Sequence, residues 1–126
     1  MDGNAAIAYG VMRSQVQLVA AYPITPQTPI VETISSLIDT GQYDASYITV
    51  ESEHSALSAL IGAASAGVRT FTASASHGLA LMHEVTGVAS ASRLPIVMAV
   101  VSRAIPGPMC LWCDHSDIMT QRDQGW

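Results

Sequence analysis

The sequence predicts a three-layer α/β domain in which a mostly parallel sheet is flanked by helices. Short apolar runs typical of buried strands alternate along the chain with longer segments of helical spacing. Strands that are separated by helices of about ten or more residues pair in parallel through right-handed crossovers. In addition, polar side chains follow each apolar run, as expected where a parallel sheet carries a ligand site at the carboxyl ends of its strands.

The first part of the chain predicts a helix, a strand and a stiff loop. Residues 4–14 have helical character, with Asp2 or Asn4 as the N-cap, and residues 17–21 are apolar enough for a buried strand. The strand is closed by the segment Tyr22-Pro23-Ile24-Thr25-Pro26. Each proline fixes its own φ and moves the preceding residue out of the helical region, so this loop presents the Thr25 hydroxyl from a stiff backbone.

The next unit consists of an amphipathic helix and a second strand. The helix is expected to begin at Pro29, with Thr28 as its N-cap and Gly41 as its stop. Its apolar residues recur at helical spacing, at Ile30, Ile34, Leu37 and Ile38. The second strand is expected at residues 47–50, and it runs directly into Glu51-Ser52-Glu53-His54.

The later units are expected to be more deeply buried. The helix after Glu53 contains no charged residue and few large side chains between Ser55 and Ala66, so most of its surface should be covered. We then expect a strand, a loop, a helix and a fourth strand, at residues 69–73, 74–77, 78–90 and 96–101. Four strands leave an unpaired edge that a stable domain needs to cover. Residues 1–126 are therefore interpreted as one domain, incomplete at its C-terminus, that forms the first part of a longer subunit.

The composition indicates a protein whose surface is covered by partners. Hydrophobic residues make up 49% of the 126 residues and charged residues only 12%, and the mean hydropathy is +0.32. Such a surface predicts an oligomer or a larger assembly. Five arginines, no lysine and ten acidic residues leave a net charge of −5, which argues against nucleic-acid binding and excludes a Walker-type phosphate loop and a lysine Schiff base.

No segment has the features of a targeting signal or a membrane span. The first residues lack the basic start of a signal peptide, and the apolar stretches are too short and too rich in Ser and Gly to cross a bilayer. A cytoplasmic location without membrane contact is therefore expected. The two cysteines, Cys110 and Cys113, do not provide a disulfide framework.

Polar side chains follow all four predicted strands. Thr25 follows the first strand, Glu53 the second, Ser76 and His77 the third, and Arg103 the fourth. Because these loops leave the same edge of a parallel sheet, we expect the side chains to converge there. They predict one wall of an active site whose other wall lies on another polypeptide.

Four motifs carry a resemblance to a known family. They are Tyr22-Pro23-Ile24-Thr25-Pro26, then Val50-Glu51-Ser52-Glu53, then Thr70-Phe71-Thr72-Ala73-Ser74 leading to Gly78-Leu79-Ala80-Leu81-Met82, and Ser102-Arg103-Ala104. In this order they resemble the N-terminal region of the α subunit of 2-oxoacid:ferredoxin oxidoreductases, with pyruvate:ferredoxin oxidoreductase as the closest type. The resemblance covers essentially the whole chain.

The resemblance implies one part of a multi-subunit enzyme. Such enzymes oxidatively decarboxylate a 2-oxoacid, pyruvate as the first choice, with coenzyme A to acyl-CoA and CO2 and reduce ferredoxin. Thiamine diphosphate would be the cofactor, and this domain would hold its pyrimidine ring. Companion subunits or domains would bind the diphosphate with Mg²⁺ and carry iron–sulfur clusters, so the chain alone should be inactive.

The resemblance also implies roles for individual residues. Glu53 matches the glutamate that hydrogen-bonds the aminopyrimidine ring, where a carboxyl group stabilises the tautomer that can activate the thiazolium carbon. Thr25 matches a residue that contacts the substrate near the reactive thiazolium carbon of the cofactor. Arg103 matches the arginine that grips the oxoacid carboxylate, for which its guanidinium fork is suited. Gly78 belongs to a matched motif and is expected to line the cofactor site, and no residue is expected to bind a metal.

These residues also have simpler structural interpretations. Glu53 could have a purely structural role, as an acid in the first helical turn that is stabilised by the helix dipole. Glu51 fits that structural role better. Thr25 also suits the N-cap of a helix that begins at Pro26. His77 is interpreted as a structural histidine bonded to backbone, with a contact to substrate or cofactor as the alternative.

Two other functions stay open for the chain as a whole. Cys110 and Cys113 form a C-x-x-C motif, which is typical of a thiol–disulfide protein or of half a metal site. Four-thiolate metal ligation would need two more cysteines, which leaves the thiol–disulfide protein as the alternative. The second alternative is a non-catalytic assembly module that is apolar because partner subunits cover it.

Overall fold

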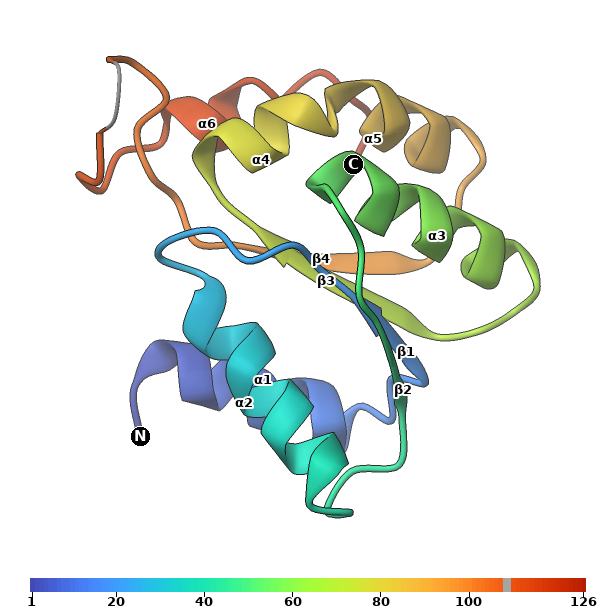
Figure 1. Ribbon diagram of the computed structural model, residues 1–126. Helices are drawn as coiled ribbons and strands as arrows, with labels where there is room; N and C mark the ends of the chain where they lie inside the picture. Colours follow the sequence, from blue (N-terminus) through green and yellow to red (C-terminus); the bar gives the residue numbers. More distant parts are fainter. Residues whose placement is uncertain (108–109) are drawn as a thin grey trace.

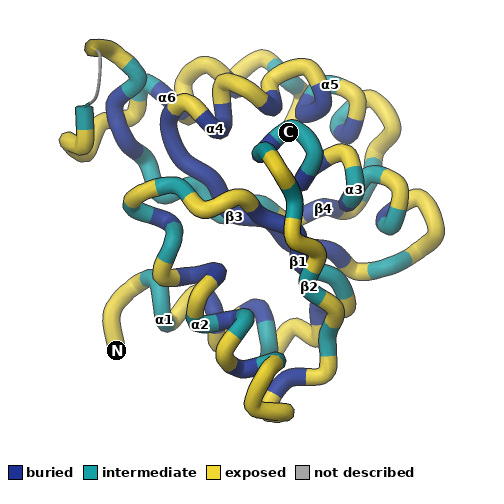
Figure 2. The backbone as a smooth tube through the Cα atoms, viewed as in Figure 1, coloured by how far each residue is buried: buried dark blue, intermediate teal, exposed yellow. Residues whose placement is uncertain are grey.

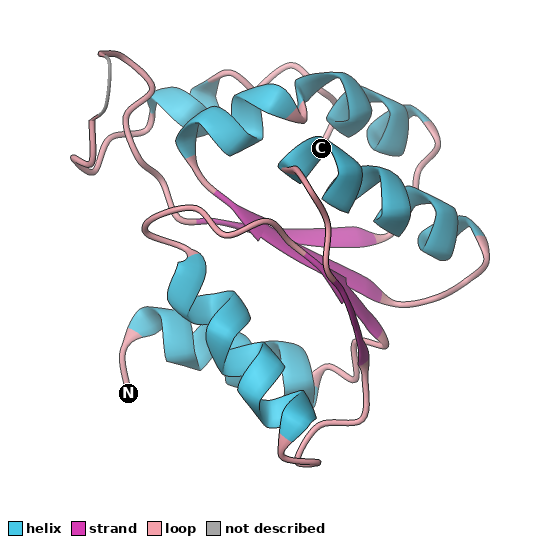
Figure 3. Cartoon of the chain, viewed as in Figure 1, coloured by secondary structure: helices cyan, strands magenta, loops and turns pink. Residues whose placement is uncertain are grey.

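The centre of the molecule is a parallel sheet. The computed structural model describes residues 1–107 and 110–126, and in this part of the chain the sheet has four strands in the order β2-β1-β3-β4. The strands are β1 (Leu18–Ala20), β2 (Ser46–Ile48), β3 (Thr70–Ser74) and β4 (Ile96–Val100). Helices lie on both faces of the sheet, which confirms the predicted three-layer α/β fold (Figures 1 and 3).

Strand β3 lies inside the sheet and is buried along its whole length, as Figure 2 shows. Its Phe71 and Ala73 pack into the core on one face of the sheet. Thr70, Thr72 and Ser74 alternate with them along the strand, and a strand directs alternate side chains to opposite faces. A strand buried on both faces is typical of a parallel sheet that is covered by helices on both sides.

One face of the sheet is covered by α1 (Gly3–Arg13) and α2 (Thr28–Asp39), which pack against each other. Asp2 caps α1 as predicted, because its Oδ1 accepts the Ala5 N–H at 2.8 Å. The predicted capping role of Thr28 is wrong, since Thr28 is the first helical residue of α2. Gln27 precedes it without a capping hydrogen bond, and its buried amide instead donates to Tyr22 O at 2.8 Å.

The other face is covered by α3 (Glu53–Ser65), α4 (Ser76–Leu81) and α5 (His83–Ala91). The predicted loop at 74–77 and the single helix at 78–90 are both wrong. Ser74 ends β3, α4 begins at Ser76, and the helix is interrupted at the fully buried Met82. A tertiary contact accounts for the early start, because a carboxylate from the C-terminal segment accepts the Ser76 N–H, one of the free donors of the helix N-terminus.

The C-terminal segment returns to the same end of the sheet. Its short helix α6 (Ser116–Met119) packs against α4, beside the loop that leaves β4 (Figure 1). The side chain of Trp126 donates from Nε1 to Thr86 O on α5 at 2.9 Å. No helix in the described residues has the length and apolar character needed to span a membrane.

Candidate active site

Glu53 is placed at the carboxyl end of the sheet by the start of α3. Ser52 is the N-cap of this helix, and its Oγ accepts the Ser55 N–H at 3.1 Å. Glu53 is therefore the first helical residue, and it is only 7% exposed. A buried carboxylate at this position differs from the solvated acids that are common in the first turn of surface helices.

The Glu53 side chain lies directly over Gly78, at the start of α4. A Cβ atom at position 78 would lie 2.7 Å from the Glu53 Cδ and 2.7 Å from Ser74 Oγ, so no larger residue fits there without a shift. Gly78 therefore allows the close approach of the two segments. Ser74 is fully buried, and its Oγ has no hydrogen-bond partner among the residues that the structure describes.

Arg103 follows β4 and reaches across the sheet end to the loop after β1. Its Nη1 donates to the backbone oxygen of Thr25 at 2.8 Å, and its Nη2 lies 3.3 Å from His77 Nδ1. Arg103 is 8% exposed, and its Nε has no partner within residues 1–107 and 110–126. Because a guanidinium only donates hydrogen bonds, His77 Nδ1 is the acceptor in this contact and the ring proton of a neutral imidazole is on Nε2.

The predicted site residues therefore meet at one edge of the sheet. Arg103 bonds Thr25 directly and contacts His77, which immediately precedes Gly78, and Gly78 lies against Glu53. Thr25 is exposed, and it is its backbone oxygen that binds Arg103. The Thr25–Pro26 peptide bond is cis. These contacts place the loops after all four strands side by side, as the topology predicted.

Two of the simpler interpretations are wrong. Thr25 does not cap a helix that begins at Pro26, because α2 begins at Thr28. His77 is not a histidine bonded only to backbone, because its Nδ1 lies near the side chains of Arg103 and Ser76, at 3.3 Å and 3.2 Å.

Glu51 and Glu53 lie two residues apart but in different surroundings. Glu51 is exposed, and its Oε1 accepts a hydrogen bond from Ser55 Oγ at 2.9 Å. Hydrogen bonds from its own backbone and from Ser55 hold the pKa of Glu51 below its ordinary value. Glu51 thus stabilises the start of α3 as an ionised acid, whereas Glu53 lies buried against Gly78.

Asp117 contacts the predicted site residues, although no role was predicted for it from the sequence. It is fully buried, and its Oδ2 accepts the backbone N–H groups of both Ser76 and Arg103 at 2.9 Å. The sequence signal was the polar segment Asp114-His115-Ser116-Asp117. Nothing in that segment distinguishes its two aspartates, of which Asp114 is exposed.

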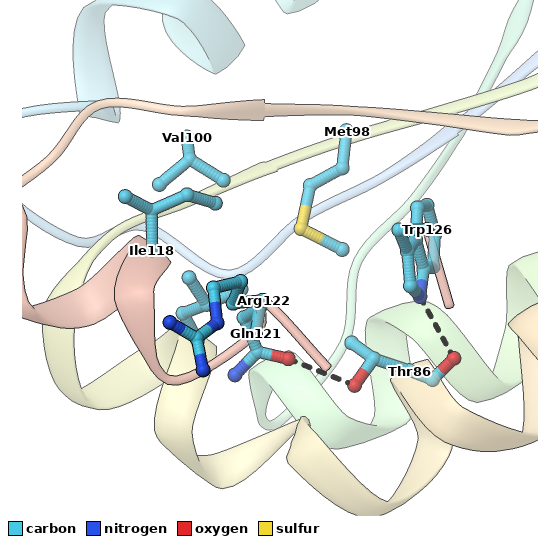
Figure 4. A pocket seen from close by; sticks show the side chains of 8 residues that line it. Thr86, Met98, Val100, Ile118, Gln121, Arg122 and Trp126 are labelled. Atoms are coloured by element: carbon cyan, nitrogen blue, oxygen red, sulfur yellow. Dashed lines mark hydrogen bonds between the residues drawn. The ribbon is translucent and has the colours of Figure 1, made fainter. Parts of the chain in front are cut away.

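An apolar pocket lies elsewhere, between β4, the helices α4 and α5, and the C-terminal segment (Figure 4). Its volume is about 260 Å³, and two of its lining residues, Thr86 and Gln121, are joined by a hydrogen bond of 3.0 Å. None of the predicted site residues lines it: the lining consists of Leu79, Thr86, Met98, Val100, Ile118, Gln121, Arg122 and Trp126. Thr25 and His77 instead lie on an open surface.

The described residues do not form a metal centre. No group of three or more His, Cys, Asp or Glu side chains in residues 1–107 and 110–126 is arranged to hold a metal ion. Cys110 is partly buried, Cys113 is exposed, and they are not joined to each other in a disulfide in the described part of the chain.

Comparison with known proteins assigns the chain to a family. Residues 9–126 match the family described as pyruvate flavodoxin/ferredoxin oxidoreductase, thiamine diphosphate-binding. The chain belongs to this family. The predicted family and its cofactor are therefore confirmed.

Individual relatives show how this family varies. The pyruvate synthase subunit PorA of Methanocaldococcus jannaschii is 55% identical over 126 residues, which are 100% of this chain and 32% of the relative. The ketoisovalerate oxidoreductase subunit VorA of Pyrococcus furiosus is 54% identical over the same shares. The chain thus spans about a third of the length of these curated relatives.

A solved structure supports the family assignment at the level of the fold. It is a 2-oxoglutarate:ferredoxin oxidoreductase from Magnetococcus marinus with 2-oxoglutarate, coenzyme A and succinyl-CoA bound. The TM-score is 0.80 at 30% sequence identity, and the match covers 88% of this chain and 19% of that chain.

Proposed function

We propose that this chain forms the pyrimidine-binding wall of the active site of a 2-oxoacid:ferredoxin oxidoreductase. The enzyme would convert a 2-oxoacid and coenzyme A to acyl-CoA and CO2, and two electrons would pass through iron–sulfur clusters to ferredoxin. The relatives are named for pyruvate, ketoisovalerate and 2-oxoglutarate, which share the 2-oxoacid group and differ in the side chain. Pyruvate is our first choice because the PorA relatives act in pyruvate synthase.

The single observation that carries the proposal is the contact between Glu53 and Gly78. It leaves a buried carboxylate at the carboxyl end of the sheet, at a place where any Cβ would fill the space. Ser74 Oγ and Arg103 Nε are buried polar atoms without a partner in the described residues. A heterocyclic ring with nitrogen donors and acceptors, together with an anionic substrate, fits this set because each orphaned group gains a hydrogen bond.

In this proposal each residue has a distinct task. Glu53 would hold a proton at a ring nitrogen of the aminopyrimidine, as a positioned acid or base. When bound, thiamine diphosphate supplies the carbon nucleophile and the electron sink that decarboxylation requires. Thr25 would contact the substrate near the reacting carbon, and Gly78 would allow the pyrimidine to approach the backbone.

Arg103 would bind the oxoacid carboxylate. Its guanidinium is already oriented by Thr25 O and His77 Nδ1, and these two contacts use two of its five N–H donors. The remaining donors can form charge-assisted bonds to a carboxylate, and little side-chain entropy is lost because the arginine is already held.

The proposal also includes the rest of the assembly. Companion subunits or domains would bind the diphosphate and Mg²⁺, carry the iron–sulfur clusters and receive coenzyme A and ferredoxin. The reaction would take place in the cytoplasm.

The test compares two glutamates in the assembled enzyme. Glu53→Gln keeps the shape of the side chain but removes its acid–base function, so we expect kcat for viologen or ferredoxin reduction to fall at least about 100-fold. Glu51→Gln is the matched control, and its kcat should stay within about 2-fold of the native value because Glu51 lies exposed outside the site. Thermal unfolding of both variants shows whether the fold is kept.

Near-native turnover of the folded Glu53→Gln enzyme would exclude the proposed role of Glu53 and favour a non-catalytic assembly module. Loss of activity after alkylation of Cys110 and Cys113 alone would instead favour the thiol–disulfide function.

A further inference from the structure

We propose that Asp117 is a positioning residue that sets the geometry of Arg103 for the substrate carboxylate. The inference rests on the proposed function, because it assigns Asp117 a task only if Arg103 binds the 2-oxoacid. It extends that function to a residue of the C-terminal segment, about forty positions away along the chain from the motif that contains Gly78.

Asp117 joins three segments through one carboxylate. Its Oδ2 accepts the Ser76 N–H, at the start of α4, and the Arg103 N–H, in the loop after β4, both at 2.9 Å. Its Oδ1 accepts the N–H of Ile118 at 2.7 Å, within its own helix α6. Asp117 is 0% exposed, and its bonds to the Ser76 and Arg103 N–H groups are both buried.

The bonds of Asp117 hold the backbone of Arg103 at the point where its side chain begins. A second bond supports this link, because Ser76 Oγ donates to Ala104 O at 2.9 Å. The guanidinium is held at its far end by Thr25 O and His77 Nδ1. Arg103 is therefore fixed at both ends, and only the Asp117 end depends on the C-terminal segment.

Ser76 itself adopts a backbone conformation that needs support. Its φ is +45°, in the left-handed region that residues other than glycine rarely adopt. Such a residue persists where the surrounding contacts determine its position. The bonds from its N–H to Asp117 and from its hydroxyl to Ala104 are these contacts.

Asp117 orients Arg103 without forming an ion pair with its guanidinium. The carboxylate is bonded to the backbone of Arg103, and no ion pair between the two side chains is found in the described residues. The buried negative charge is compensated by three N–H donors. A direct ion pair would compete with the substrate carboxylate for the guanidinium, and this arrangement leaves the guanidinium free for the substrate.

The experiment uses the assembled enzyme and measures KM for the 2-oxoacid and kcat separately. Asp117→Ala removes both bonds between segments, and we expect KM to rise about 10-fold with kcat at saturation within about 3-fold of native. Asp117→Asn keeps an oxygen acceptor without the charge, so its KM should rise only about 3-fold, because charge-assisted bonds are roughly twice as strong as neutral ones. The control Asp123→Asn changes the same charge at an exposed position next to Arg122 and should leave both constants within about 2-fold.

A double variant separates positioning from a general loss of structure. If Asp117 acts through Arg103, adding Asp117→Ala or Asp117→Asn to Arg103→Ala should raise KM no further than Arg103→Ala alone. Additive effects, or a KM of Asp117→Asn within about 1.5-fold of native, would overturn the inference. The Asn variant decides the matter if the Ala variant does not assemble. An unchanged KM in Arg103→Ala would instead refute the proposed substrate role of Arg103, whatever the Asp117 variants show.

Discussion

Glu51 and Glu53 illustrate how surroundings decide the role of a residue. The two side chains are chemically identical and lie on either side of the Ser52 N-cap. Glu51 is exposed and bonded to Ser55, whereas Glu53 begins the helix and lies buried over Gly78. The sequence favoured Glu53 because it matches the glutamate of the family motif, and the structure adds a reason that the sequence does not contain, the contact with a glycine from another βα unit.

Gly78 and Gly62 make a matched pair for testing this contact. In Gly78→Ala the new Cβ would lie within 3 Å of Glu53 and Ser74, so we expect a displaced Glu53 and a Kd for thiamine diphosphate at least about 10-fold weaker. Gly62→Ala lies in α3 with nothing within 4 Å of its Cβ, and we expect unchanged affinity and a gain of about 0.5–1 kcal/mol in stability. Titration of the cofactor into the assembled protein measures the affinity of each variant, and thermal unfolding measures the stability. Equal affinities in the two variants would contradict the predicted cofactor contact.

At the scale of elements, long-range contacts decide where helices begin and strands are anchored. Helix α4 begins at Ser76 because Asp117 accepts its N–H, and the left-handed φ of Ser76 occurs at this junction. At the other end of the sheet, Tyr43 follows α2 and its hydroxyl donates to Val16 O, before β1, at 2.5 Å. Such side-chain bonds connect segments that the local sequence pattern treats as separate.

The Tyr43 bond leads to a stability prediction. Tyr43→Phe leaves the Val16 carbonyl without this donor, and we expect the free energy of unfolding at pH 7 to fall by about 1–3 kcal/mol. Burial raises the pKa of Tyr43, so the folded state holds the phenolic proton more tightly than the unfolded chain. The native protein should therefore lose this stability as the pH rises above about 10, and the variant should lack that part of the alkaline loss.

Urea unfolding at pH 7 and at alkaline pH measures both effects. Tyr47→Phe is the control: its bond to Ala21 O is longer, at 3.3 Å, and burial also raises the pKa of Tyr47. A larger destabilisation in the control than in Tyr43→Phe would show that the Val16 bond is not what stabilises this end of the sheet.

At the scale of the whole molecule, the candidate site lies on an exposed surface and forms one wall of the proposed active site. Thr25 and His77 are exposed, and none of the predicted site residues lines the apolar pocket of Figure 4. Large apolar side chains are also exposed in the C-terminal segment, with Trp112 at 81% and Leu111 at 60%. Exposed apolar surface of this kind is typical of a face that a partner covers.

This exposed wall predicts that turnover depends on assembly. The chain expressed by itself should reduce no viologen with any 2-oxoacid, because half of the proposed cofactor site is missing. Adding the companion subunits should restore activity, and size-exclusion chromatography of the mixture should show a complex. Turnover by the isolated chain would contradict the two-walled site.

The sequence by itself determined the alternation of strands and helices, the parallel sheet, and the positions of Thr25, Glu53, Gly78 and Arg103 after the four strands. These features follow from hydrophobic periodicity and from the rule that parallel strands share one carboxyl edge, both of which are local or topological. Only the tertiary structure decided that Gly78 lies under Glu53 and that His77 contacts Arg103. It also decided that the helix after β3 begins early and breaks at Met82, and that Asp117 joins the start of α4 to the loop after β4. Each of these depends on atoms from segments far apart in the chain, and the spacing of residues within one segment carries no information about them.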